Sequence, residues 1–196
     1  MTKLTSTLAL ACATFGIAVA GSMTTTTATA DNLRPYVSFA ATHDMFEWNL
    51  GGGAVFDDES FGYKPAIGFD YKIDGSFVEA GLEAGYRFYS EYEEAGVSIE
   101  ADGFTLGGHA GIRLTDSGNI RVKLHGGVFF WEVDATIPGV GSGSEDGDDF
   151  FYGIGLDFAA TEQFTIGLLY EHQDFAVDGA PDPEIDSIGL RGALYF

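Results

Sequence analysis

The chain has 196 residues, of which 45% are hydrophobic, and its formal net charge at pH 7 is −21. This length suits a single domain with a sizeable core. The mean hydropathy of +0.07 is too low for a bundle of membrane-spanning helices, while the hydrophobic content is too high for a disordered chain. Only nine Lys and Arg residues stand against thirty Asp and Glu residues, which argues against a nucleic-acid partner, because phosphate recognition needs clustered cationic side chains.

The first thirty residues have the features of a secretory signal peptide. Lys3 supplies a positive charge, and residues 8–19 form an apolar run that is too short to span a bilayer. Two small-x-small motifs follow. We expect cleavage after the second, Ala28-Thr29-Ala30, directly before Asp31, with cleavage after Ala20 as the alternative. The sequence therefore predicts export through the Sec pathway.

The exported domain is expected to span residues 31–196. The only cysteine, Cys12, lies in the signal, so this domain has no thiol for a disulfide or a thiolate metal site. It also lacks two His residues close together in sequence. We therefore expect neither a metal ion nor another cofactor.

From residue 35 onward, apolar residues alternate with polar or small ones. A period of two predicts β-strands with one apolar face, and the alternation is complete between Val78 and Phe88. Tight-turn sequences such as Asp74-Gly75-Ser76 separate some of the segments. Eight segments can be drawn: 35–42, 63–73, 76–88, 104–114, 120–130, 152–158, 164–171 and 185–196.

Three features of these segments favour a barrel in a membrane over a soluble β-sandwich or soluble barrel, the alternative fold. The apolar faces carry no charge in their central spans, and aromatic residues gather at the ends of the segments. Long and short connections alternate, as they do between the outer loops and periplasmic turns of such barrels. The sequence predicts an all-β fold, a transmembrane eight-stranded antiparallel up-and-down β-barrel with both termini in the periplasm. The expected long loops are 42–62, 89–103, 134–149 and 174–184.

The Gly-x-Gly pattern of residues 152–156 and the final segment, which alternates and stops on an aromatic residue, carry a family resemblance. The exported domain resembles the OmpA/OmpX-like outer-membrane β-barrel family. The resemblance implies the outer membrane of a Gram-negative cell. It also implies a C-terminal signal for the barrel-assembly machinery, formed by Ile188, Leu190, Leu194 and Phe196.

The polar faces of the segments place charged side chains inside the barrel. An eight-stranded barrel encloses little more than its own side chains, so these charges are expected to pair and to close the lumen. A narrow ion pathway is the alternative. His109 and His125 lie on the same inner wall. The predicted network comprises Asp70, Lys72, Glu79, Glu83, Arg87, Arg113, Arg121, Lys123, Asp157, Glu171 and Arg191.

The surplus acidic residues fall in the expected loops, where they form either a solvated surface or a surface that binds divalent cations and bridges to outer-leaflet lipopolysaccharide. We expect a monomeric structural or interaction protein. A narrow passive channel for small solutes is one alternative. A lipid A-modifying enzyme is another, but His43 with Asp44 and His172 with Asp174 have no nucleophile motif beside them, so no catalysis is expected.

Overall fold

The computed structural model describes residues 32–196 except 52–53, 74–75, 95, 116, 138, 140 and 177–182. The predicted signal peptide and its cleavage site at Ala28, Ala30 and Asp31 lie outside these residues. Among the described residues, no helix is long and apolar enough to cross a membrane. The strands are β1 (Leu33–Gly51), β2 (Ala54–Lys72), β3 (Val78–Tyr89), β4 (Tyr92–Glu94), β5 (Val97–Arg113), β6 (Ile120–Ile137), β7 (Gly141–Ala159), β8 (Phe164–Asp174) and β9 (Glu184–Tyr195).

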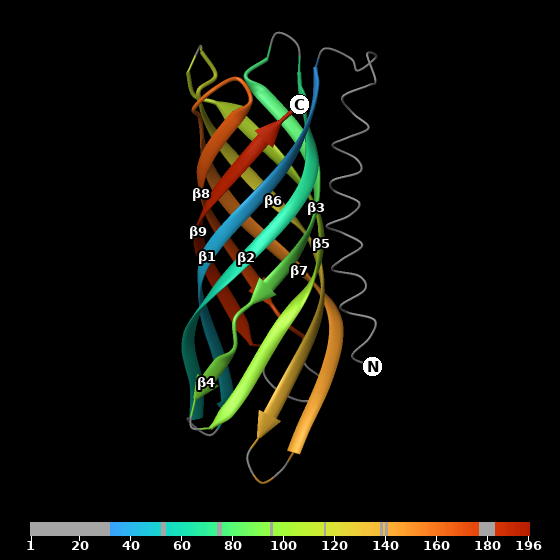
Figure 1. The fold of residues 1–196 in the computed structure, drawn as a ribbon, viewed down its shortest axis with the longest axis vertical. Coiled ribbons are helices and arrows are strands. Elements are labelled where there is room, and N and C mark those ends of the chain that lie inside the picture. The colour runs from blue at the N-terminus through green and yellow to red at the C-terminus, as the bar shows by residue number, and fades with distance from the viewer. Residues whose placement is uncertain are drawn as a thin grey trace.

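The strands form one closed antiparallel barrel (Figure 1). Neighbours in sequence pair around the wall, β3 pairs with β5, and β9 returns to pair with β1. The closing pair places Tyr195 opposite Tyr36 and Leu190 opposite Ala41. The short β4 resumes the path of β3 and pairs with the beginning of β5, so the barrel itself has eight strands. The predicted eight-stranded antiparallel up-and-down fold is confirmed.

The two ends of the barrel differ, as Figure 1 shows. Short turns and the C-terminus lie at one end, and long hairpins project from the other. The prediction that 42–62 and 134–149 are loops is wrong, and most of the predicted loop 89–103 is also strand, because β4 pairs with the start of β5. β1 and β2 stay paired from Leu33 opposite Tyr71 out to Asn49 opposite Val55, and β6 and β7 stay paired out to Ile137 opposite Gly141. These stretches are β-hairpins that lengthen the barrel.

The outer face of the barrel is apolar over its central part. Leu124, Leu168 and Leu190 keep 62%, 55% and 60% of their surface exposed. Their sequence neighbours Lys123, Gly167 and Arg191 point inward on the other face. The phase of the alternation is therefore the predicted one in these segments. A wall of exposed leucines would be costly in water and needs an apolar solvent.

Glycine on the inner face lets neighbouring strands and their side chains pack closely together. A Cβ on Gly81 would lie 2.2 Å from the carbonyl oxygen of Phe69 and 2.5 Å from the His109 ring. Neither distance leaves room for a methyl group. The glycines of the polar face thus serve a crowded interior rather than a solvated surface.

The inner face changes character toward the hairpin end. There it carries a buried aromatic cluster in place of charged side chains. Trp131 and Phe175 pack edge to face at 5.6 Å, and Phe129 does the same against Tyr89 at 6.3 Å. We call this group the aromatic plug. It comprises Phe46, Phe56, Tyr89, Tyr92, Ile99, Ala101, Phe129, Trp131, Phe151, Phe175 and Ile185.

Candidate functional site

The interior between the aromatic plug and the short turns is centred on Glu171, which is fully buried on β8. Its carboxylate contacts the ammonium of Lys64 and the guanidinium of Arg87. The His125 Nε2 atom lies 3.3 Å from the same carboxylate. Arg87 also reaches Asp44 at 3.2 Å and donates a hydrogen bond of 2.6 Å to the Ser187 hydroxyl. Two cations thus share one carboxylate in a space without room for bulk water.

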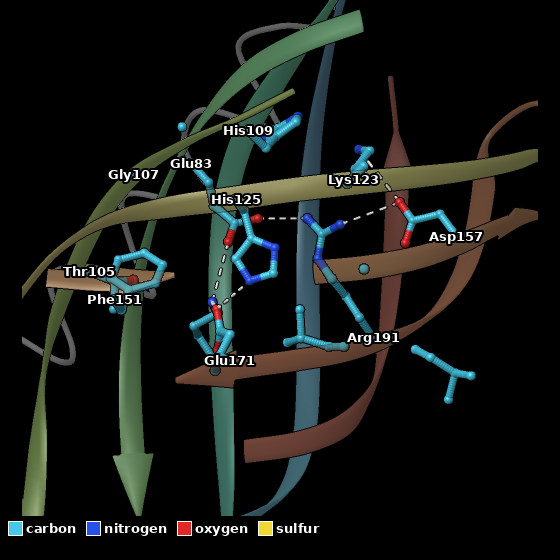
Figure 2. Close-up of a pocket in the computed structure, with 15 residues that line it drawn as sticks. Glu83, Thr105, Gly107, His109, Lys123, His125, Phe151, Asp157, Glu171 and Arg191 are labelled. Atoms are coloured by element: carbon cyan, nitrogen blue, oxygen red, sulfur yellow. Dashed lines mark hydrogen bonds and ion pairs between the residues drawn. The ribbon is translucent and has the colours of Figure 1, made fainter. Parts of the chain in front are cut away.

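The ion pairs continue across the middle of the barrel. Lys64 lies 3.7 Å from Glu83, and Arg191 lies 2.6 Å from the other oxygen of that carboxylate. Arg191 also reaches Asp157 at 3.8 Å, and Lys123 reaches Asp157 at 3.5 Å. Figure 2 shows Arg191 between Glu83 and Asp157, with dashed lines to both. These contacts join side chains from five strands.

A third group of contacts lies toward the short-turn end. Lys123 approaches Asp70 at 3.0 Å and Glu79 at 3.6 Å, and Arg121 approaches the same two carboxylates at 3.7 and 3.3 Å. The His109 Nε2 atom lies 2.7 Å from Asp70. Together the three groups form one continuous network, which we call the lumen network. Its members are Asp44, Lys64, Asp70, Glu79, Glu83, Arg87, His109, Arg121, Lys123, His125, Asp157, Glu171 and Arg191.

Lys72 and Arg113 were expected in this network but lie apart from it. Both line a cavity of about 630 Å³ at the short-turn end, and Arg113 donates a hydrogen bond to the Ser76 carbonyl. Conversely, sequence reasoning missed Asp44, which it placed in the expected loop 42–62, and Lys64, which lies at the start of the predicted segment 63–73. Counting back from the inward residue Asp70 in steps of two reaches Lys64, so the alternation could have identified this lysine.

Two further cavities lie along the interior. One of about 40 Å³ is lined by Lys64, Glu83 and Glu171, among others, and has room for about three water molecules. Another of about 230 Å³ lies at the hairpin end against Trp48 and Trp131 of the aromatic region. No residue lines more than one of these three cavities. Side chains of the lumen network line the first two of these cavities, and side chains of the aromatic plug line the third.

A family comparison explains this architecture. Residues 15–196 match the family described as outer membrane protein beta-barrel domain. The chain belongs to this family. The apolar outer wall therefore faces the lipid of a Gram-negative outer membrane, and the charged side chains of the lumen network lie inside an outer-membrane barrel.

Solved outer-membrane barrels share this fold. Ail, the attachment invasion locus protein of Yersinia pestis, is 14% identical with a TM-score of 0.59, over 84% of this chain and 99% of Ail. Neisserial surface protein A is 15% identical with a TM-score of 0.58, over 83% of this chain and 97% of that one. A search of curated proteins found no match. At these identities the likeness shows the fold alone.

The lipid-facing wall ends at the same level on the four adjacent strands β8, β9, β1 and β2. Tyr170 of β8 lies opposite Ile188 of β9, and Ile188 lies opposite His43 of β1. Within the next two outward positions toward the hairpins, acidic side chains replace apolar ones on β8, β9, β1 and β2. We call this band the acidic collar. It comprises Glu47, Asp57, Glu59, Asp174, Glu184 and Asp186.

The two rim histidines considered for catalysis have different surroundings. His43 points outward, 3.3 Å from Glu59, whereas Asp44 is buried in the lumen network, so the two do not act together. His172 does meet Asp174, at 3.2 Å, as its spacing suggested.

His172 also approaches Asp186 at 2.8 Å. Partial burial opposes its ionisation, but hydrogen bonding to Asp186 and the charge of Asp174 raise the pKa of His172. Sequence reasoning missed that this imidazole shares a cluster with Glu184.

Proposed function

We propose that this protein is a closed, non-conducting outer-membrane barrel with a structural or interaction role, which presents its hairpins at the cell surface. The continuous lumen network, with the aromatic plug next to it at the hairpin end, is the observation that carries this proposal. An ion crossing the barrel would have to separate buried ion pairs such as that of Arg87 with Glu171, both fully buried. Doing so leaves unpaired charges in a space of low dielectric, which costs several kcal/mol.

The proposed orientation places the hairpins outside the cell and both termini in the periplasm, after export through the Sec pathway. Long strands on the outside and short turns in the periplasm are the usual arrangement of such barrels. The hairpins would then bring their acidic residues to the lipopolysaccharide headgroups. Residues 43–63, 88–112 and 124–190 contain no Lys or Arg. In the membrane, the protein would act as a monomer.

The charge of the hairpins limits the ligands they would select. A structure of Ail contains sucrose octasulfate, a heparin analogue and polyanion. Hairpins without Lys or Arg would repel such a ligand. We therefore infer that cationic partners, or divalent cations that bridge to anionic lipid, bind here. We assign no catalysis, because neither rim imidazole hydrogen-bonds a Ser or Thr hydroxyl among the described residues.

A planar-bilayer measurement tests closure directly. The refolded protein is expected to give no stable discrete conductance step. As a comparison, replacing Arg87 and Glu171 together by Ser removes both members of a buried pair and opens space beside the central cavity. We expect this variant, with its β-sheet circular dichroism retained, to show conductance steps. A stable conductance of the unaltered protein would refute the closed lumen and establish the channel alternative.

Deleting Phe196 is expected to impair assembly in cells far more than it destabilises the folded barrel. Its side chain is 46% exposed, and its backbone N–H donates one hydrogen bond of 3.0 Å to the Pro35 carbonyl, so its loss costs about 1 kcal/mol. The folded fraction in isolated outer membranes, followed by heat-modifiable gel mobility, is the measurement. Phe164→Ala, another exposed aromatic on the lipid face, is the control and should assemble normally. Normal insertion of the truncated chain would show that the terminal residues are no assembly signal.

A further inference from the structure

Four side chains of the acidic collar and its edge gather on the outer wall of β8 and β9. His172 and Asp174 project from β8, and Glu184 and Asp186 lie directly opposite on β9. The pairing register sets this cluster: Asp186 is the partner of His172, and Glu184 is the partner of Asp174. The cluster begins one outward step beyond Tyr170 and is therefore reached from water at the margin of the lipid-facing wall.

Three of these residues lie close enough together to hold one metal ion. Ligand atoms of His172, Asp174 and Glu184 all lie within 4.8 Å of one another. The His172 Nε2 atom is 3.2 Å from Asp174 Oδ1. Zinc–nitrogen and zinc–oxygen bonds of about 2.0–2.2 Å at tetrahedral angles separate neighbouring ligand atoms by about 3.3 Å. We propose that His172, Asp174 and Glu184 bind one divalent transition-metal ion, such as Zn²⁺, on the outer wall of the barrel.

Asp186 acts as a positioning residue for this site. It accepts a hydrogen bond from His172 Nδ1 at 2.8 Å, which leaves Nε2 as the nitrogen that binds the metal. The Tyr170 hydroxyl donates to the same Asp186 oxygen at 2.7 Å, and the Tyr152 ring packs 5.1 Å from the imidazole. Metal-binding histidines commonly donate their second N–H to a carboxylate in this way, which fixes the ring and raises its basicity.

The ligand set favours one class of metal. An imidazole nitrogen suits Zn²⁺, Cu²⁺ or Ni²⁺, whereas Mg²⁺ and Ca²⁺ prefer sites made only of oxygen. Three protein ligands also leave a fourth position open to water or to an external ligand. This separates the site from the remainder of the acidic collar, where carboxylates attract cations without a geometric preference.

Isothermal titration of the refolded barrel with ZnCl₂ tests the proposal. We expect one Zn²⁺ per barrel, with much weaker binding of MgCl₂. His172→Gln should abolish the Zn²⁺ isotherm, and Asp186→Asn should weaken it by about 10–100-fold, because a positioning carboxylate is lost. His43→Gln is the matched control: this rim imidazole faces a single carboxylate, Glu59, so its loss should leave the affinity unchanged.

Two further measurements make the result decisive. All three substituted side chains lie on the outside of the barrel, so heat-modifiable gel mobility should show that the variants fold. In NMR spectra, Zn²⁺ should shift the imidazole signals of His172 and leave those of His43 in place. Zn²⁺ binding that survives His172→Gln, or Mg²⁺ binding of equal strength, would overturn the proposal and show that the collar holds cations diffusely.

Discussion

Replacing Glu171 by Gln is expected to lower the free energy of unfolding by about 3–5 kcal/mol. The carboxylate is fully buried and contacts the cations of both Lys64 and Arg87. The amide keeps the volume but removes the charge, so Lys64 is left with Glu83 at 3.7 Å and Arg87 with Asp44 at 3.2 Å. Removing one member of a buried ion network costs the desolvation of the partners that remain.

Urea-induced unfolding in lipid vesicles measures this loss, and the protein's two tryptophans, Trp48 and Trp131 at the hairpin end, report it by fluorescence. Glu93→Gln, an exposed change on β4, is the control and should stay within about 0.5 kcal/mol. A loss below 1 kcal/mol for Glu171→Gln would mean that water screens the lumen network and that the interior is open.

A double-mutant cycle separates the interaction energy of the Arg87–Glu171 pair from the cost of leaving one buried charge unpaired. Arg87→Met combined with Glu171→Gln should destabilise the barrel by less than the sum of the two single changes, because no lone cation remains at that contact. If the double change destabilises the barrel by the sum of the two single changes, the two side chains contribute independently.

Which residues of each strand face outward was predictable, because every segment of the barrel wall has lipid on one side and the polar interior on the other. Outward apolar residues such as Leu124 and Leu168 alternate with inward residues along each strand, and a charged side chain on the outward face would be costly in lipid. Alternation alone therefore identified the inward Asp70, Glu83 and Arg191. The partner of each charge was not predictable, because Lys64 and Glu171 meet across 107 residues through the closure of the whole barrel.

The sequence analysis missed the hairpins because the polarity of the two strand faces reverses along a single strand. In the lipid belt the apolar side chains face outward, and toward the hairpin tip they face inward. In β6, Leu124 faces outward and Lys123 inward, whereas nearer the tip Trp131 faces inward and its neighbour Glu132 does not enter the plug. The backbone alternation is unbroken, but the solvent outside has changed from lipid to water. A search for apolar outward faces ends at this boundary, and so 42–62 was expected to be a loop.

The cluster around His172 could not be predicted from the sequence, for a related reason. Only the β8–β9 register places Glu184 beside Asp174, and the segment 177–182 between them gives no spacing that resembles a metal motif. Sequence-local rules for His and Cys ligands detect sites on one helix or turn. Sites assembled across strands need the pairing first.

Replacing Leu124 by Arg is expected to destabilise the barrel in lipid by about 2–4 kcal/mol. Leu124 lies midway along the apolar wall, between Ala110 of β5 and Ile154 of β7, and is 62% exposed. At that depth a guanidinium must lose its hydration or draw water into the hydrocarbon. The same change on a soluble barrel would be nearly neutral, so the sign and size of the effect identify the solvent outside the wall.

Val55→Arg is the depth control for this experiment. Val55 also points outward and is 48% exposed, but it lies near the tip of the β1–β2 hairpin, beyond the acidic collar. There the arginine meets water and should cost about 0–1 kcal/mol. Urea unfolding of both variants in the same vesicles gives the comparison. Equal effects at the two positions would place the apolar belt elsewhere on the barrel, whereas a large difference locates the membrane between Val55 and the short turns.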